Sequence, residues 1–259
     1  MTSTIRSLAI WSVVGVLIVC WLPLLAIIRL LDSDPAHYRT GLWFRKLGIA
    51  ITRINPNWKM QIAGQKIENP RNPYVVVGNH QSHADIPLIS NLPWEMKWMV
   101  KAELFRILFI GQMLRLAGDI PVERGNRRKA ALAFLQAARY LDQKCSVMFF
   151  PEGTRSPDGM VHQFAEGAFH LAIKSKVPIL PLAVDGSRDC LPKNSWRIGK
   201  VDRIFLKVLP PVRTDDLQAE DVSALRDRVR AMIIAQVAEW RNVPPEEVDG
   251  NRSLVAVRD

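Results

Sequence analysis

The stretch from Leu8 to Ile28 limits the fold more than any other feature of the sequence, because it contains no charged side chain. Its length matches the roughly 20 apolar residues that an α-helix needs to cross the hydrocarbon core of a bilayer. Trp11 and Trp21 lie near its two ends, and tryptophan is enriched at the ends of membrane helices. The sequence therefore predicts an amino-terminal helix that anchors the protein in a membrane.

The residues around this helix bear on its cleavage and orientation. The segment "RLLDSDPAH" that follows it has no small-residue site typical of signal-peptide cleavage, so we expect the helix to be retained. Only Arg6 precedes the helix, whereas a cluster of basic residues follows it (Arg29, Arg39, Arg45, Lys46, Arg53 and Lys59). This asymmetry predicts that the rest of the protein lies on the cytoplasmic side, at the inner membrane if the source is bacterial.

A second helix is predicted from Tyr38 to Ile54, where basic and apolar residues have helical spacing. Such an amphipathic helix suits the plane of a membrane interface, but packing on the folded domain explains the pattern equally well. The sequence also does not distinguish a first helix that spans the bilayer from one that lies in a single leaflet.

After Pro56, short β-branched runs alternate with longer stretches of helical spacing. The predicted strands are 74–77, 98–100, 119–123, 146–150, 179–184 and 203–208, and the predicted helices are 103–118, 126–144, 164–176 and 221–242. This order predicts an α/β fold with a largely parallel central sheet flanked by helices. We therefore expect anchoring helices in residues 1–60, an α/β domain in 61–242 and a polar, loosely held tail in 243–259.

Charge and cysteine content narrow the class of partner and the compartment. The chain has 35 Lys and Arg against 25 Asp and Glu, a formal net charge of +10, which favours anionic partners such as a phospholipid surface or a phosphorylated substrate. Nucleic acid is not expected, because no aromatic platform is interleaved with the basic residues. The three cysteines (Cys20, Cys145 and Cys190) are odd in number and widely spaced, which argues against a disulfide framework or zinc ribbon and for a reducing compartment.

Polar clusters follow three of the predicted strands: residues 79–85, 123–124 and 151–155. Chemistry collects at the carboxyl ends of strands in open α/β sheets, so the three clusters are predicted to face one cleft. In the first cluster, the offset of five residues lets Asp85 reach Nδ1 of His80, which leaves Nε2 free to accept a proton. The pair is thus a candidate general base, although a loop histidine followed by a helix-capping aspartate explains the spacing equally well.

Metal and covalent chemistry fit the sequence less well. A metallo-hydrolase pattern of the type H-x-H-x-D-H would need histidines at Gln81 and Ile86, so no metal site is predicted and His83 is interpreted as a loop residue. The sequence has no G-x-S-x-G motif, and no cysteine lies in a polar cluster that would form a thiolate. A base without its own nucleophile activates a hydroxyl or a water that belongs to the substrate.

The segment "FFPEGTRSPDG" has the composition of an anion-binding turn. Gly153 permits a tight backbone, Thr154 is a short donor, and Arg155 supplies the planar guanidinium that suits phosphate. A turn with a solvated arginine would look the same. In "GDIPVERGNRRK", Arg124 is the basic residue that we interpret as functional, while Arg127, Arg128 and Lys129 would contact the membrane or an acidic donor.

Together the polar blocks resemble the 1-acylglycerol-3-phosphate (lysophosphatidic acid) O-acyltransferases, a family of the glycerolipid acyltransferases. Four blocks match in order and spacing: "NHQSHAD", which looks like the family's HX4D motif, "GDIPVER", "FPEGTRS" and "VPILPLAV". The resemblance covers roughly residues 73 to 211. Pro121 is a departure, since many relatives carry an aromatic residue there.

The resemblance implies transfer of a fatty acyl group from an acyl-CoA or acyl-carrier-protein thioester to the sn-2 hydroxyl of a lysophospholipid at a membrane surface, giving phosphatidic acid. It implies that His80 is the base and that Asp85 orients it, with no tightly bound cofactor and no metal. Arg124, Arg155 and Lys101 would hold the acceptor's phosphate, while Glu152, Gly153 and Thr154 would shape the substrate site.

Four points stay open. The acceptor could be another lysophospholipid or a lyso-aminolipid, and the donor carrier is not fixed by the sequence. The chain could also be a membrane-tethered protein that binds anionic lipids without turnover. The apolar helix predicted at 103–118 would line an acyl-chain slot or simply pack in the core.

Overall fold

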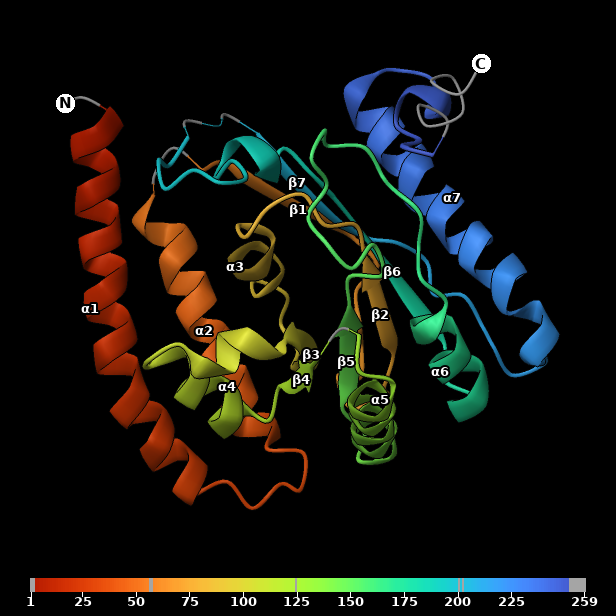
Figure 1. The fold of residues 1–259 in the computed structure, drawn as a ribbon, viewed down its shortest axis with the longest axis horizontal. Coiled ribbons are helices and arrows are strands. Elements are labelled where there is room, and N and C mark those ends of the chain that lie inside the picture. The colour runs from red at the N-terminus through yellow and green to blue at the C-terminus, as the bar shows by residue number, and fades with distance from the viewer. Residues whose placement is uncertain (1–2, 56–57, 124, 200, 202, 252–259) are drawn as a thin grey trace. The chain divides into compact units, whose positions relative to one another are not determined.

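The computed structural model describes residues 3–55, 58–123, 125–199, 201 and 203–251 (Figure 1). The chain divides into two compact units, each assembled from separate stretches of sequence. The first unit comprises Met1–Pro56, Glu68–Tyr74 and Ile86–Met148, and the second comprises Asn57–Ile67, Val75–Asp85 and Phe149–Asp259. The strands are mostly parallel and are flanked by helices, which confirms the predicted α/β fold.

The first unit contains the anchoring helices and three parallel strands. β3 (Met96–Lys101) pairs with β5 (Ser146–Phe149) on one side and with β4 (Ile120–Val122) on the other. The helices of this unit are α1 (Ser3–Leu30), α2 (Tyr38–Ile54), the short α3 (Asp85–Ile89), the 3-10 helix η1 (Ala102–Arg106), α4 (Ile110–Ala117) and α5 (Arg127–Asp142). Asn126 caps α5 as predicted, since its side chain accepts the backbone N–H of Lys129.

The second unit contains four strands in the order β1 (Met60–Gly64), β7 (Ile204–Val208), β6 (Ile179–Asp185) and β2 (Val75–Gly78). β6 and β7 are antiparallel, and the other two pairs are parallel. Every residue of β2 and β6 is buried, as expected for strands covered on both faces. The helices are α6 (Gly167–Ser175), α7 (Val222–Arg241), which packs along β6, and the 3-10 helices η2 (Ser187–Asp189), η3 (Ala219–Asp221) and η4 (Pro245–Glu247).

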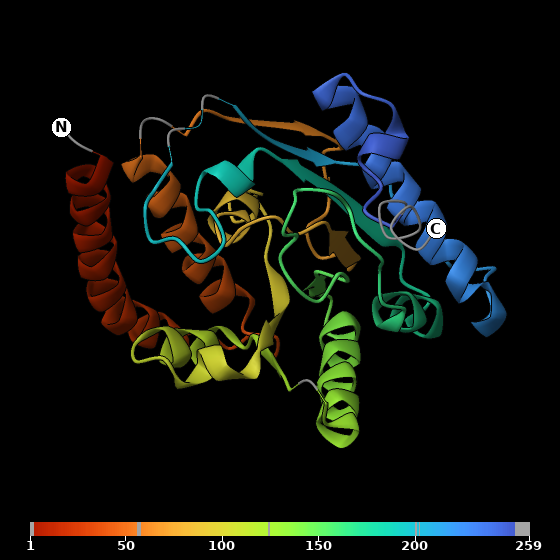
Figure 2. The same ribbon diagram turned by 45° about the horizontal axis from the view of Figure 1, so that its top comes forward.

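The predicted amino-terminal apolar helix is confirmed as α1. Within Thr4–Leu30 of α1, an 18-residue window has a mean hydropathy of 2.6, so this helix is long and apolar enough to cross a membrane. α2 lies beside α1 in both views (Figures 1 and 2). The two helices share a core built around Leu25 and Leu47, and the indole N–H of Trp21 donates to the carbonyl of Trp43 at 3.0 Å. The helix predicted at 38–54 therefore packs on its neighbours, and its outer face carries exposed basic residues.

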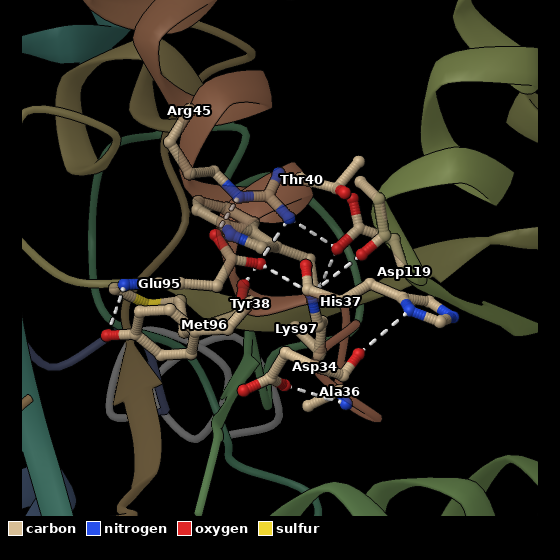
Figure 3. A network of polar contacts seen from close by, with 12 residues as sticks. Asp34, Ala36, His37, Tyr38, Thr40, Arg45, Glu95, Met96, Lys97 and Asp119 are labelled. Carbon is tan, nitrogen blue, oxygen red and sulfur yellow. Dashed lines mark hydrogen bonds and ion pairs between the residues drawn. The ribbon is translucent and has the colours of Figure 1, made fainter. Parts of the chain in front are cut away.

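A buried cluster of charges joins the inner face of α2 to the strands of the first unit (Figure 3). Arg45 of α2 bonds Glu95 at 3.3 Å and also Asp119, while Lys97 of β3 bonds Glu95 at 2.9 Å. Two cations and two carboxylates thus neutralise one another. Lys97 also donates to the carbonyl of Ala117 at 2.7 Å, so an ammonium with a fully buried side chain keeps hydrogen-bond partners.

Gly41 allows α2 to approach this cluster. A Cβ atom at position 41 would lie 2.0 Å from Oε1 of Glu95 and 2.7 Å from Nζ of Lys97. Both distances are far inside van der Waals contact, so any larger residue would displace the buried ion pair. The glycine fixes how closely the helix can sit on the strand.

One predicted helix differs from the structure, and one strand was missed. The helix predicted at 103–118 is broken into η1 and α4, because Phe109 adopts a positive φ of 64° and the chain folds back on itself. Gly111 makes this possible, since a Cβ there would lie 2.1 Å from the carbonyl oxygen of Phe105. Strand β1 was not predicted, because four of its five residues are exposed and "MQIAG" lacks an alternating apolar face.

The predicted looseness of the carboxyl-terminal tail is wrong for residues 243–251. Val248 is fully buried, and its carbonyl accepts the backbone N–H of Val161 at 2.9 Å. Arg230 of α7 forms an ion pair with Asp249 at 2.6 Å. Residues 252–259 lie outside the described part of the chain.

The glycine contact predicts an unusual response to alanine. Gly41→Ala should destabilise the protein by about 1–3 kcal/mol, because the new methyl group collides with the buried Glu95–Lys97 pair. A helical Gly→Ala change without such a clash stabilises by up to about 1 kcal/mol. Gly15→Ala in α1 is the matched control, since a Cβ atom at position 15 would have no neighbour within 4 Å. The free energy of unfolding in detergent, measured for both variants, tests this; equal effects at the two glycines would contradict it.

Candidate active site

The candidate site is built on the turn that follows β2. Asn79 comes directly after the strand, and its side chain is fixed to β6: Nδ2 donates to the carbonyl of Val184 at 2.8 Å, and the N–H of Val184 donates back to Oδ1 at 2.9 Å. This paired hydrogen bond extends the sheet by one residue. The chain therefore leaves the strand at a defined place and direction immediately before His80.

The structure places His80 and Asp85 in direct contact, as their spacing predicted. Nδ1 of His80 lies 2.7 Å from Oδ2 of Asp85. The same carboxylate oxygen accepts the backbone N–H groups of Gln81 at 2.8 Å and Ser82 at 3.0 Å. The Asp85 side chain is fully buried, whereas that of His80 is 13% exposed. A buried carboxylate thus orients an imidazole that still reaches the surface.

The backbone of His80 is fixed by the segment after β5. Its N–H donates to Oε1 of Glu152 at 2.8 Å, and its carbonyl accepts the N–H of Ser156 at 2.7 Å. The imidazole ring stacks on Phe150 at a centroid separation of 4.0 Å. In the described part of the chain, no hydrogen bond is formed by Nε2 of His80. That nitrogen is therefore available to accept a proton from a substrate.

Glu152 connects two loops through its carboxylate. Besides the N–H of His80, it accepts the N–H of His162 at 3.3 Å through Oε2. Burial raises the pKa of Glu152 from its ordinary value of 4.5 to about 7, although these two N–H groups act in the opposite direction. The glutamate that the sequence assigned to the substrate site is thus also a support for the backbone of His80.

The turn predicted to bind an anion has the expected form. Gly153 has a φ of 69°, a conformation that glycine adopts without strain, and its N–H donates to the carbonyl of Phe150 at 3.0 Å. Gly153 and Thr154 are exposed and Arg155 is half-buried. The guanidinium of Arg155 forms no ion pair with any residue in the described ranges. The cation is therefore available to an anionic ligand.

His83 lies on the same turn but does not resemble a second base. Desolvation of its ring by the surrounding chain, together with the charges of Arg155 and His80, lowers its pKa to about 4. The ring is thus neutral near pH 7. Among the described residues, no hydrogen bond joins His83 to Asp85.

Two predicted phosphate ligands, Lys101 and Arg124, belong to the sequence range of the first unit. Lys101 ends β3, and its half-exposed ammonium lies 3.5 Å from Glu103. Arg124 lies outside the described residues. The structure therefore brings together six of the eight predicted site residues, all in the second unit: His80, Asp85, Glu152, Gly153, Thr154 and Arg155.

Sequence reasoning missed the supports of this turn. Besides Asn79 and Phe150, the side chain of Gln81 is buried and donates to Asp185 at 3.0 Å. Asp185 in turn forms an ion pair with Arg241 of α7 at 2.5 Å. Only Asn79 could have been found from the local sequence, because it follows a predicted strand directly. The other partners are more than 60 residues from this turn along the chain.

The cysteines do not supply a nucleophile. Cys145 and Cys190 are buried free thiols, and Cys20 is exposed on α1. Burial raises the pKa of Cys145 to about 12 and also raises that of Cys190 far above its ordinary value. Neither buried group is a thiolate near neutral pH.

Comparison with known proteins identifies relatives of this chain. A family model described as Acyltransferase matches residues 59–185, the range that holds all four sequence blocks. The 1-acyl-sn-glycerol-3-phosphate acyltransferase alpha of Mus musculus is 37% identical over 174 residues, covering 66% of this chain and 61% of the mouse protein. The chain thus matches less than two thirds of that relative's length.

Two further relatives are covered more fully. The crystal structure of the 1-acyl-sn-glycerophosphate (LPA) acyltransferase PlsC from Thermotoga maritima matches with a TM-score of 0.75 and 26% identity, over 93% of this chain and 98% of that one. The 1-acyl-sn-glycerol-3-phosphate acyltransferase of Limnanthes alba is 31% identical over 82% of this chain and 71% of its own length. With His80 and Asp85 in contact, these matches show that the chain belongs to the 1-acyl-sn-glycerol-3-phosphate acyltransferase family.

Proposed function

We propose that this protein transfers a fatty acyl group from an acyl-CoA or acyl-carrier-protein thioester to the sn-2 hydroxyl of 1-acylglycerol-3-phosphate, giving phosphatidic acid for phospholipid biosynthesis. The observation that carries the proposal is the 2.7 Å contact between His80 and Asp85, with Nε2 of His80 forming no hydrogen bond to any described residue. The names of the relatives support the choice of acceptor.

The reaction follows from the position of the free nitrogen. Nε2 of His80 takes the proton of the acceptor hydroxyl while the oxygen attacks the thioester carbonyl carbon. The carbon–oxygen bond forms, the carbon–sulfur bond breaks, and the imidazolium returns its proton to the departing sulfur. The buried carboxylate of Asp85 stabilises the imidazolium between these two transfers. The atoms and protons of this reaction balance with the two substrates and these side chains alone.

The remaining site residues act on binding and position. Arg155, whose guanidinium forms no ion pair among the described residues, would bind the acceptor's phosphate, while the parts that the resemblance implies for Arg124 and Lys101 stay predictions. Glu152 holds the peptide of His80, and the exposed Gly153–Thr154 turn gives the acceptor access to the backbone. Phosphate bound beside the base would orient the hydroxyl, which is how a positioned substrate gains rate.

We also propose that α1 and α2 lie together in the cytoplasmic leaflet. A groove of about 630 Å³ between them is lined by Val13, Leu17 and Trp21 of α1 and by Lys46 and Arg53 of α2, among others. If α1 crossed the bilayer, these two exposed cations would be placed beside its middle, inside the hydrocarbon, at a cost of several kcal/mol. Lying in one leaflet keeps both charges at the headgroups.

The first prediction concerns the base. His80→Ala should lower the rate of acyl transfer by about 10²–10⁴-fold, and Asp85→Asn should cause a similar loss, because both remove the oriented proton acceptor. Thiol release from acyl-CoA with lysophosphatidic acid measures the rate, and a panel of other lysolipids checks the acceptor. His170→Ala, an exposed histidine of α6, is the control and should retain activity. Full activity in folded His80→Ala protein would rule the mechanism out.

The second prediction uses the raised pKa of Glu152. The unfolded chain loses the proton of this carboxyl near pH 4.5, whereas the folded protein keeps it up to about pH 7. The contribution of this carboxyl to stability is therefore largest below pH 4.5 and falls as the pH rises to about 7. The melting temperature of Glu152→Gln minus that of the wild type should therefore increase from pH 5 to pH 8. Glu220→Gln, at an exposed position, is the control; a difference that does not change with pH would contradict the assignment.

The third prediction concerns membrane depth. In a Cys20→Ser background, Lys46→Cys and Arg53→Cys should both react with a membrane-impermeant maleimide in inside-out vesicles, because their side chains lie at the cytoplasmic headgroups. Val16→Cys, on the outer apolar face of α1, should be protected. Protection at 46 and 53, or labelling only from the opposite side, would show that the helices are inserted differently.

A further inference from the structure

The loop that follows β6, Gly186–Gly199, is attached to the candidate active site. The hydroxyl of Ser82, inside the turn between His80 and Asp85, donates to the carbonyl of Leu191 at 2.8 Å. Arg188 donates to the carbonyl of Asp158 at 2.6 Å. Within the loop, the N–H of Gly199 donates to the carbonyl of Cys190 at 2.9 Å, and the Cys190 side chain is buried. The loop is therefore held beside the site by several independent contacts.

Lys193 extends from this loop to the anion-binding turn. Its ammonium donates to the backbone carbonyl of Arg155 at 3.3 Å, and its side chain is exposed. A lysine ammonium has three N–H donors, so two remain for a ligand. No carboxylate in the described part of the chain forms an ion pair with either Lys193 or Arg155.

The hydrogen bond from Lys193 to the backbone carbonyl of Arg155 brings the two basic residues to one turn, and an anion that reaches both side chains would form charge-assisted hydrogen bonds with each. The neighbouring ring of His83 is neutral near pH 7 and adds no third charge. The charges of Arg155 and His80 both act on the ring of His83, so the guanidinium of Arg155 lies close to the turn that carries the base. An anion held by Lys193 and Arg155 would thus lie near the catalytic imidazole.

We propose that Lys193 and Arg155 together bind one phosphate group of a substrate. The proposal rests on the function proposed above and adds a ligand from a loop outside the four sequence blocks. Phosphate is the chemistry shared by two sources: the sn-3 phosphate of the acceptor and the phosphates of the donor's carrier group. A planar guanidinium and a flexible ammonium, carried by two segments that a hydrogen bond joins, can engage different oxygens of the same group.

Steady-state kinetics of Lys193→Ala distinguish the two sources. If the acceptor's phosphate binds here, KM for lysophosphatidic acid should rise about tenfold while KM for acyl-CoA stays unchanged. If the donor's phosphates bind here, KM for acyl-CoA should rise about tenfold, and an acyl thioester of N-acetylcysteamine, which has no phosphate, should react equally well with both proteins. Lys193→Arg should recover most of the loss. Lys174→Ala, which removes an exposed charge from α6, is the matched control.

Equilibrium binding gives a readout that does not depend on turnover. In a His80→Ala background, calorimetric titration with lysophosphatidic acid in micelles and with CoA should show a loss of about tenfold in affinity for one of them on Lys193→Ala. Unchanged affinity and unchanged KM for both ligands would overturn the proposal even if the wild type acylates lysophosphatidic acid. Lys193-dependent binding in a wild-type protein that acylates no acceptor would instead overturn the proposed reaction and keep the phosphate site.

Discussion

The buried carboxylate of Asp85 is the constraint on which the candidate site depends. Removing a charged carboxylate from water is costly unless hydrogen bonds compensate, and here one oxygen accepts from two backbone N–H groups and from the imidazole of His80. Satisfying that oxygen forces the chain between the two residues into a tight turn. The turn that stabilises the charge is therefore the same turn that presents His80, so folding and the orientation of the base have a single cause.

The turn is rigid because distant segments hold each of its first residues. Asn79 is paired with β6, the peptide of His80 lies between Glu152 and Ser156, and the side chain of Gln81 reaches Asp185, which Arg241 of α7 neutralises. A base held at this many points needs little rearrangement when a substrate binds, and preorganised groups contribute to rate because their order is established during folding.

Local patterns in the sequence predicted more than long-range contacts did. The strand ends, the bounds of the second helix and the five-residue offset of His80 and Asp85 are all encoded within a few neighbouring residues. The stacking of Phe150 on His80 and the approach of Lys193 to Arg155 join segments tens of residues apart, which periodicity does not report. The break at Phe109 was hidden for a different reason: the run around it is continuously apolar, and only the close passage of Gly111 over Phe105 shows why the chain turns.

Adjacent residues on α2 explain how one helix serves both the core and the membrane. Arg45 points inward and is neutralised by Glu95 and Asp119, whereas Lys46 is exposed on the groove shared with α1. Successive helical residues are about 100° apart, so neighbours can face opposite environments. Because the inward guanidinium is buried in a charge network that would be costly to break, α2 cannot slide or rotate on β3 without leaving charges unpaired. The basic outer face is thereby held in a fixed orientation relative to the strands of the first unit, and a membrane surface that engages it would hold those strands in the same orientation.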